Sequence, residues 1–316
     1  MTLPRDPQVM ETAAAPPAGG APRRWRARGT AIAAPWRSLG RVRLGLRAAL
    51  PPAVLLGVLL VVWHLFAVGS VRDAQVLPTP SAVWSALIMQ RALLWGHTVV
   101  TLRETLVGFG VALATGVVLA ALIDLSPWLR RAFYPVLVIS QTIPIITLAP
   151  LLVFWFGFGL ASKVIVVTLV CFFPIVVAAV DGLRATDPEL IELYRTFGAG
   201  ALRIFWSVRV PGALPSLFSG VRIAITYSVI GAIFGEYVGA SEGLGFYIQQ
   251  QQHSFATNRV MAAIVVTALL SVALFAATTL IERLALPWYY AAGRAADWRE
   301  DPGHAGAVGV WGEGRN

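Results

Sequence analysis

The chain has 316 residues, of which 57% are hydrophobic and 13% charged, and its mean hydropathy is +0.71. Soluble domains carry about 25% charged residues, so this composition excludes an ordinary soluble protein and indicates an integral membrane protein. The net charge of +9 does not indicate nucleic-acid binding, because the arginines flank apolar runs as they do in membrane proteins.

The N-terminal region is rich in Ala, Pro, Gly and Arg. Nine arginines and little apolar periodicity predict a disordered cytoplasmic tail over residues 1–47. The apolar run that follows, residues 51–70, is 20 residues long. This length exceeds that of the hydrophobic region in a cleavable signal peptide, so we expect a retained first membrane span.

Five further apolar segments predict membrane helices within a transmembrane domain over residues 48–290. The second to sixth predicted spans are residues 98–123, 132–156, 164–180, 214–234 and 260–281. Residues 291–316 are polar and Gly-rich and predict a C-terminal cytoplasmic tail. The predicted fold is therefore an all-α polytopic membrane protein with six transmembrane helices.

The distribution of basic residues predicts the orientation in the membrane. With the N-terminus inside the cell, the segments predicted to be cytoplasmic hold 19 of the 25 basic residues, and the external segments hold four. Lys and Arg are enriched in cytoplasmic loops, so this distribution favours that orientation. Both termini and the loop between spans four and five, residues 187–215, are then predicted to be cytoplasmic.

This loop predicts two short amphipathic helices that meet at a glycine hinge. Asp187 suits the N-cap of the first helix and Pro188 its first position, while Gly198 and Gly200 end it. The second helix is predicted to end at Pro211. One face of the first helix is apolar and consists of Leu190, Leu193, Tyr194 and Phe197.

The predicted third span contains prolines that kink or break a membrane helix, because proline lacks a backbone donor. Polar residues near this break, and others on span five, are candidates for a substrate pathway. These candidates are Gln141, Thr142, Pro144, Thr147, Thr226 and Tyr227. Ser and Thr also join membrane helices by hydrogen bonds, so ordinary helix packing remains an alternative for each of them.

The sequence contains no motif for enzymatic chemistry. The nearest string to a phosphate-binding loop, residues 157–163, lacks the glycine that stands beside the lysine in that motif. The H-E-x-x-H metalloprotease motif is absent, the four histidines are scattered, and Cys171 is the single cysteine. We therefore expect no catalytic residue, no metal site and no cofactor in this chain.

A transporter needs a source of energy, and the sequence shows no obvious one. Ion-driven carriers place ionisable residues in the middle of the membrane, whereas most acidic residues here lie in loops or at span ends. Arg222 is the clearest charge inside a span. We therefore expect a partner to supply the energy, with a self-sufficient ion-coupled secondary transporter as the alternative.

The loop at residues 187–215 resembles a known family. Glu192, Gly198 and Pro211 match the spacing of the E-A-A-x-x-x-G-x9-I-x-L-P loop in permease subunits of bacterial importers of the ATP-binding cassette (ABC) class. The motif's other positions hold Leu193, Tyr194, Val208 and Val210. The segments 144–159 and 235–248 extend the resemblance to the branch that imports nitrate, sulfonates, taurine and pyrimidine-type precursors.

This resemblance implies partners and roles for the chain. It implies an inner-membrane permease that pairs with a second copy, accepts a small solute from a periplasmic or extracellular solute-binding protein, and docks on ATPase subunits that bind ATP and Mg. The coupling helix that docks on the ATPase would comprise Glu192, Leu193, Tyr194, Phe197, Gly198 and Pro211. An amphipathic helix that rests on the bilayer is the alternative for this segment. The turn at residues 243–245 is either part of the surface for the binding protein or a plain loop.

Overall fold

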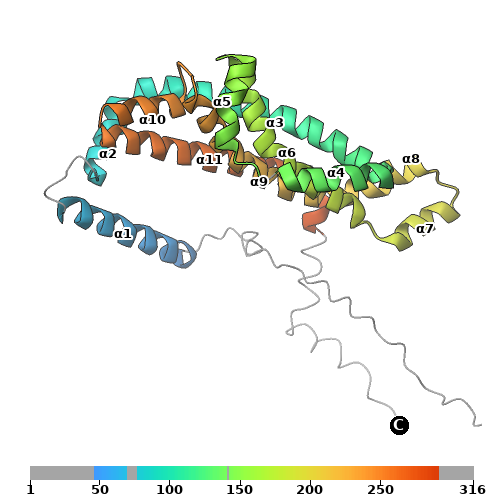
Figure 1. Cartoon of the computed structure of the whole chain (residues 1–316). Helices are drawn as coiled ribbons and strands as arrows, with labels where there is room; N and C mark the ends of the chain where they lie inside the picture. The colour runs from blue at the N-terminus through green and yellow to red at the C-terminus, as the bar shows by residue number, and fades with distance from the viewer. Residues whose placement is uncertain (1–45, 70–76, 141, 292–316) are drawn as a thin grey trace, which may run out of the picture. The chain divides into compact units, whose positions relative to one another are not determined.

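The computed structural model describes residues 46–69, 77–140 and 142–291, and every regular element in these ranges is helical (Figure 1). The predicted tails, residues 1–47 and 291–316, lie almost wholly outside the described residues. The elements are α1 (Leu46–Gly69), α2 (Pro80–Met89), α3 (Arg91–Leu125), α4 (Pro127–Ser140), α5 (Ile145–Phe156), α6 (Leu160–Arg184), α7 (Pro188–Thr196), α8 (Ala201–Ile204), the π-helical turn η2 (Phe205–Arg209), α9 (Val210–Tyr237), α10 (Leu244–His253) and α11 (Thr257–Ala285). The chain divides after Val58, inside α1, into two compact units, and the second contains all the features below.

Five helical stretches in the described part of the chain are long and apolar enough to cross a membrane. They are Leu50–Gly69, Arg91–Leu125, Leu160–Arg184, Ala201–Tyr237 and Thr257–Ala285. A polytopic all-α membrane protein is thus confirmed, and five of the six predicted spans each correspond to one long helix.

The predicted third span, residues 132–156, is not one helix. It comprises most of α4 and all of α5, and the chain between them bends at residues 142–144. Pro144 is the N-cap of α5 and has an extended backbone. Proline lacks the N–H that a continuing helix needs, and it disfavours a helical conformation at the residue before it, so the predicted break at Pro144 is confirmed. The predicted interruptions at Pro135 and Pro150 are wrong, because these prolines lie inside α4 and α5.

Helices α3, α6 and α9 form the centre of the second unit. Their shared core consists of Ala112, Val167, Cys171, Ile175, Val221, Ala224 and Ala232. Gly220 of α9 lies so close to α6 that a Cβ atom there would collide with Ala178 and would lie 2.6 Å from the carbonyl oxygen of Pro174. Small residues let membrane helices approach closely, so Gly220 permits the tight contact between α6 and α9.

A second core joins α2, α10 and α11 to the start of α3. It contains Leu94, Leu244, Tyr247 and Ile248 together with small residues of α11. In Figure 1, α10 lies at one end of the long helices of this unit, and α7 and α8 lie at the other. Helix α9 runs between the two ends, and each end carries a group of residues with distinct chemistry.

Candidate functional site

Helix α7 forms as the local sequence predicts. The side chain of Asp187 accepts a hydrogen bond from the backbone N–H of Glu189 at 2.9 Å, and Pro188 occupies the first helical turn. An aspartate N-cap satisfies one of the donors that a helix leaves free at its start, and proline has no donor to lose there. The start of the helix is therefore fixed by two adjacent residues.

The end of α7 is fixed by Gly198. Its φ angle is +75°, and its N–H donates to the carbonyl oxygen of Arg195 at 2.9 Å. The N–H of Ala199 donates to the carbonyl oxygen of Tyr194 at 3.0 Å. This pair of bonds is a Schellman motif, which needs a residue in the left-handed region and therefore favours glycine. The predicted glycine hinge is a defined turn.

Large apolar side chains on and after α7 are exposed. Phe197 is 80% exposed, and Leu190 and Leu193 are about half exposed at 46% and 49%. Tyr194 is only half-buried, and Glu192 is exposed. The exposure continues into the next turns with Leu202 and Trp206. Apolar patches of this kind mark interaction surfaces, so these residues form a candidate docking face, which we call the α7 face.

The second helix of the loop does not end at Pro211, so that prediction is wrong. The chain from Ala201 to Tyr237 is continuously helical and passes through η2 into α9. In η2 the N–H of Val210 donates to the carbonyl oxygen of Phe205, five residues back. This wider turn lies directly before Pro211, which occupies the first turn of α9. The wider hydrogen-bond spacing of η2 accommodates a residue without an N–H at this point, so the helix continues through Pro211.

An ion pair ties this junction to α3. Arg209, the last residue of η2, donates from Nη1 to Oδ2 of Asp124 at 2.6 Å. The side chain of Asp124 is almost fully buried, whereas that of Arg209 is about one third exposed. Asp124 lies at the end of α3, so the start of α9 is held to the end of a central helix.

The predicted substrate-pathway residues do not form one hydrogen-bonded site. Gln141 lies outside the described residues. Thr142 and Thr147 are exposed, and their hydroxyl groups donate to carbonyl oxygens three residues earlier, at 2.8 and 2.6 Å. Thr226 donates to the carbonyl oxygen of Arg222 at 3.0 Å, and Tyr227 is about half exposed. Within the described ranges, no hydrogen bond or ion pair joins the α4–α5 break to α9.

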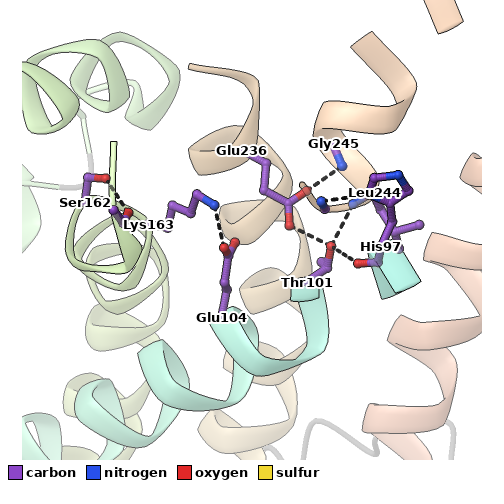
Figure 2. Close-up of polar contacts among 10 residues, drawn as sticks. His97, Thr101, Glu104, Ser162, Lys163, Glu236, Leu244 and Gly245 are labelled. Atoms are coloured by element: carbon purple, nitrogen blue, oxygen red, sulfur yellow. Dashed lines mark hydrogen bonds and ion pairs between the residues drawn. The ribbon is translucent and has the colours of Figure 1, made fainter. Parts of the chain in front are cut away.

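The other end of α9 carries a buried polar cluster around Glu236, whose side chain is fully buried (Figure 2). Glu236 accepts hydrogen bonds from the hydroxyl of Thr101, at 2.6 Å, and from the N–H of Gly245. Thr101 also accepts from the N–H of Leu244 at 2.8 Å, and His97 Nδ1 accepts from the N–H of Gly243 at 3.0 Å. We call His97, Thr101, Glu236 and the turn 243–245 the Glu236 cluster.

A buried ion pair lies beside this cluster (Figure 2). Lys163 of α6 donates from Nζ to Oε1 of Glu104 on α3 at 2.6 Å, and the two side chains are 10% and 4% exposed. A charge buried without a partner is very costly, so each of these residues makes the other tolerable inside the helical bundle.

A third ion pair joins α9 to α11. Nε of Arg222 lies 3.3 Å from Oε2 of Glu282, and the hydroxyl of Tyr290 donates to Oε1 of the same carboxylate at 2.9 Å. In the sequence, Arg222 is the clearest charge inside a predicted span, and no partner was predicted for it. The structure shows that it pairs with an acidic residue of the last long helix.

Sequence reasoning missed the Glu236 cluster and all three ion pairs. The useful signal was the set of charges at the ends of the predicted spans, such as Glu104, Lys163 and Glu236. Ionisable residues in membrane helices pair with one another, so isolated acids and bases in different spans predict ion pairs in general. The sequence does not specify which acid meets which base.

Comparison with known proteins identifies the family. Residues 112–286, more than half of the chain, match the family model described as "Binding-protein-dependent transport system inner membrane component". The formylaminopyrimidine transport permease protein ThiX of Halalkalibacterium halodurans is 38% identical over 241 residues, which cover 76% of this chain and 96% of ThiX. The taurine transport system permease protein TauC of Escherichia coli is 29% identical over 241 residues, with 74% and 88% coverage.

A solved structure supports the fold. An inward-facing form of the MetNI methionine ABC transporter aligns with a TM-score of 0.53 at 24% sequence identity, and covers 58% of this chain and 92% of the matched chain. At this identity the likeness concerns the fold alone. The family match and the ThiX relative carry the assignment: the chain belongs to the family of binding-protein-dependent transport system inner membrane components, and is a multi-pass ABC transporter permease, not itself an enzyme.

Proposed function

We propose that this chain couples ATP hydrolysis by a partner ATPase to solute import through the α7 face. The observation that carries the proposal is the exposure of Phe197 and its apolar neighbours on a short helix with well-defined ends. In water such a surface is unfavourable, and burying it in a cleft of a partner would supply binding energy. ATP and Mg would be bound by that partner.

The proposed orientation places the α7 face inside the cell and the Glu236 cluster on the outer side. The excess of basic residues in the segments around α7 supports this arrangement, because Lys and Arg are enriched on the cytoplasmic side. Both termini are then cytoplasmic. A solute-binding protein would deliver its solute to the outer side of a dimer of this chain, with one ATPase subunit docked on each copy.

The solute pathway is proposed to pass the break between α4 and α5. Thr142, Pro144 and Thr147 surround this break and are exposed, and Thr226 and Tyr227 of α9 supply further polar groups. Irregular backbone at membrane depth is tolerated where it is buried in protein or lines a water-filled cavity, which favours a pathway at such a break. Gln141 belongs to the same proposal from its position in the sequence.

We infer that the solute is a pyrimidine-type precursor. The wider range implied by the family resemblance also includes nitrate, sulfonates and taurine. The support within this range is the higher identity to ThiX, 38%, than to TauC, 29%; the riboflavin transport permease RibX of Chloroflexus aurantiacus is also 38% identical, so riboflavin is titrated as a competing solute. The test is direct calorimetric titration of the solute-binding protein that stimulates the complex of this chain. Tight binding of formylaminopyrimidine and no binding of taurine, an alkanesulfonate or nitrate is expected, and the reverse preference would refute this choice of solute.

Replacing Gly198 tests the coupling role. The Gly198→Val chain should still insert into the membrane, but solute-stimulated ATPase activity of the assembled complex should be abolished. The reason is backbone conformation, because valine disfavours a φ of +75° strongly, although no atom lies within 4 Å of the added Cβ.

Gly200→Val is the matched control for this experiment. Gly200 lies two residues away, also has no atom within 4 Å of an added Cβ, and has a φ of −70° that valine adopts readily. This variant should retain most of the stimulated activity. Normal stimulation in the Gly198→Val complex would reject α7 as the coupling element.

A further inference from the structure

The turn at residues 243–245 is built around the carboxylate of Glu236. Gly243 has a φ of +115°, and a Cβ atom at this position would collide with the Glu236 carboxyl group. A Cβ atom at Gly245 would lie 2.6 Å from the carbonyl oxygen of Ile233 and 2.9 Å from Oε2 of Glu236. The backbone of the turn can approach the carboxylate only because both positions are glycine.

The same turn is the N-terminus of α10, and side chains from other helices satisfy its backbone donors. The N–H groups of Gly243, Leu244 and Gly245 donate to His97, Thr101 and Glu236, respectively. A helix leaves its first four N–H groups without partners inside the helix, and a side chain of its own cap usually accepts one of them. Here Gly243 is the N-cap and has no side chain to offer. Helices α3 and α9 therefore cap α10.

Thr101 joins these contacts into one network. Its hydroxyl oxygen accepts from the N–H of Leu244 at 2.8 Å, and its hydroxyl donates within reach of two acceptors, Oε1 of Glu236 at 2.6 Å and the carbonyl oxygen of His97 at 3.1 Å, of which the carboxylate is the nearer. Figure 2 shows Thr101 between the turn and the carboxylate. A hydroxyl with both roles in use has a fixed orientation. A change in the position of α10 therefore acts on α3 through His97 and Thr101 and on α9 through Glu236, and Thr101 links the two helices.

The apolar contacts of α10 do not require this network. Tyr247, Ile248 and Leu244 already pack in the core shared with α2 and α11. A buried carboxylate costs more than an apolar residue of similar size, so burial alone does not explain Glu236. Directional hydrogen bonds fix the orientation of a helix in a way that apolar packing does not.

We propose that Thr101 and Glu236 are positioning residues that hold the start of α10 in the orientation recognised by the solute-loaded binding protein. Docking of that protein is then transmitted to α9, whose other end continues into η2 and the α7 face. This inference rests on the proposed function. It assigns to two buried residues a role in docking of the solute-loaded binding protein at the outer surface.

The experiment uses the full complex of this chain, its ATPase and its solute-binding protein in lipid vesicles. Three substitutions are compared. Thr101→Val removes the hydroxyl group and keeps the shape of the side chain, and Thr101→Ser keeps the hydroxyl group. Thr115→Val is the control, because it makes the same Thr-to-Val replacement at another position of α3. The hydroxyl of Thr115 bonds within its own helix, to the carbonyl oxygen of Val111 at 2.7 Å. ATPase activity is measured without binding protein and at increasing concentrations of solute-loaded binding protein.

The Thr101→Val complex should need about tenfold more binding protein for half-maximal stimulation, on the scale of one lost hydrogen bond. Its activity without binding protein should stay within about twofold of the wild type. The proposed network affects the response to the binding protein, whereas ATP is hydrolysed in another subunit. The Thr101→Ser and Thr115→Val complexes should resemble the wild type. An unchanged half-maximal concentration, or a parallel fall of both activities, would overturn the proposal.

A second variant and a second measurement protect the test against misfolding. Glu236→Gln leaves one acceptor oxygen for the two donors, Thr101 and Gly245, so one of them faces the amino group, and the network is weakened without removing the side chain. Amide hydrogen exchange of residues 243–248 should be faster in this variant than in the wild type, and its half-maximal concentration should rise. Unchanged exchange and an unchanged concentration would overturn the proposal. A wild-type complex that the binding protein does not stimulate would reject the proposed function itself.

Discussion

The two ends of α9 differ in how their polar and apolar groups are satisfied. At the Glu236 end, the charged and polar side chains are buried, and their hydrogen bonds are made within the chain. At the Arg209 end, the helix continues back through η2 and α8 to large apolar side chains that are exposed. At one end the chain supplies the partners of a buried carboxylate, and at the other it presents a group of exposed apolar side chains on a short helix.

This difference indicates a division of labour along one helix. A helix of 28 residues is about 42 Å long at 1.5 Å per residue, so it can connect surfaces on opposite sides of a membrane. If one end is held rigidly by its neighbours and the other docks on a separate subunit, motion of either surface reaches the other through α9. The following predictions test the two ends separately.

The largest effect is expected from breaking the buried ion pair beside the Glu236 cluster. Lys163→Met leaves the Glu104 carboxylate buried without its cation and should lower the free energy of unfolding by about 3–5 kcal/mol. Thermal denaturation of the purified chain in detergent measures this loss. The double variant Glu104→Leu with Lys163→Met should recover most of it, because no buried charge remains. An unchanged midpoint for Lys163→Met alone would show that the pair does not hold this end.

The second effect concerns the α7 face. Phe197→Ala should weaken binding to the ATPase subunit by about 30-fold, which corresponds to about 2 kcal/mol for a central aromatic contact. The thermal stability of the isolated chain should not change, because Phe197 is 80% exposed and contributes little to internal packing. Affinity is measured as binding of the detergent-solubilised chain to ATPase subunits immobilised on a sensor surface.

Phe255→Ala is the matched control for this second prediction. Phe255 is 78% exposed, almost the same as Phe197, but it lies after α10, at the other end of the long helices. Its replacement should leave binding to the ATPase unchanged. Equal losses in the two variants would mean that detergent contacts, and not docking, explain the result.

The smallest effect is expected at the link between the end of α3 and η2. Asp124→Asn removes the charge that Arg209 contacts and should cost about 1 kcal/mol or less of stability, because Arg209 is partly exposed. Solute transported per ATP hydrolysed should fall severalfold, a larger change than the stability loss, because the start of α9 is less firmly held. Asp181→Asn, at an exposed position of α6, is the control. A transport ratio equal to that of the control would remove this ion pair from the coupling route.

Local sequence signals predicted α7 well because its ends depend on neighbouring residues. Asp187 and Pro188 begin the helix, and Gly198 ends it in the left-handed conformation. Pro144 likewise marked the break between α4 and α5, whereas Pro135 and Pro150 lie inside these helices. In these places the backbone chemistry of one or two residues decides the structure, so the sequence alone is sufficient.

The tertiary contacts were not predictable in the same way. Glu104 and Lys163 are 59 residues apart, and Thr101 and Glu236 are 135 apart. Their meeting depends on how three long helices pack, and no short pattern records that packing. The continuation of the helix through Pro211 was also not predicted. A π-helical turn arises from the balance of contacts along a helix and has no simple sequence signature.

The π-helical turn sets the rotational phase between the docking surface and the membrane. Such a turn is equivalent to one residue inserted into an otherwise regular helix, and each residue of an α-helix advances by about 100° around its axis. Deleting one residue from Phe205–Arg209 would restore a uniform helix and rotate α8 by roughly that angle relative to α9. The single extra residue thus decides the direction in which α7 leaves the helix, and with it the direction in which the α7 face is presented to a partner.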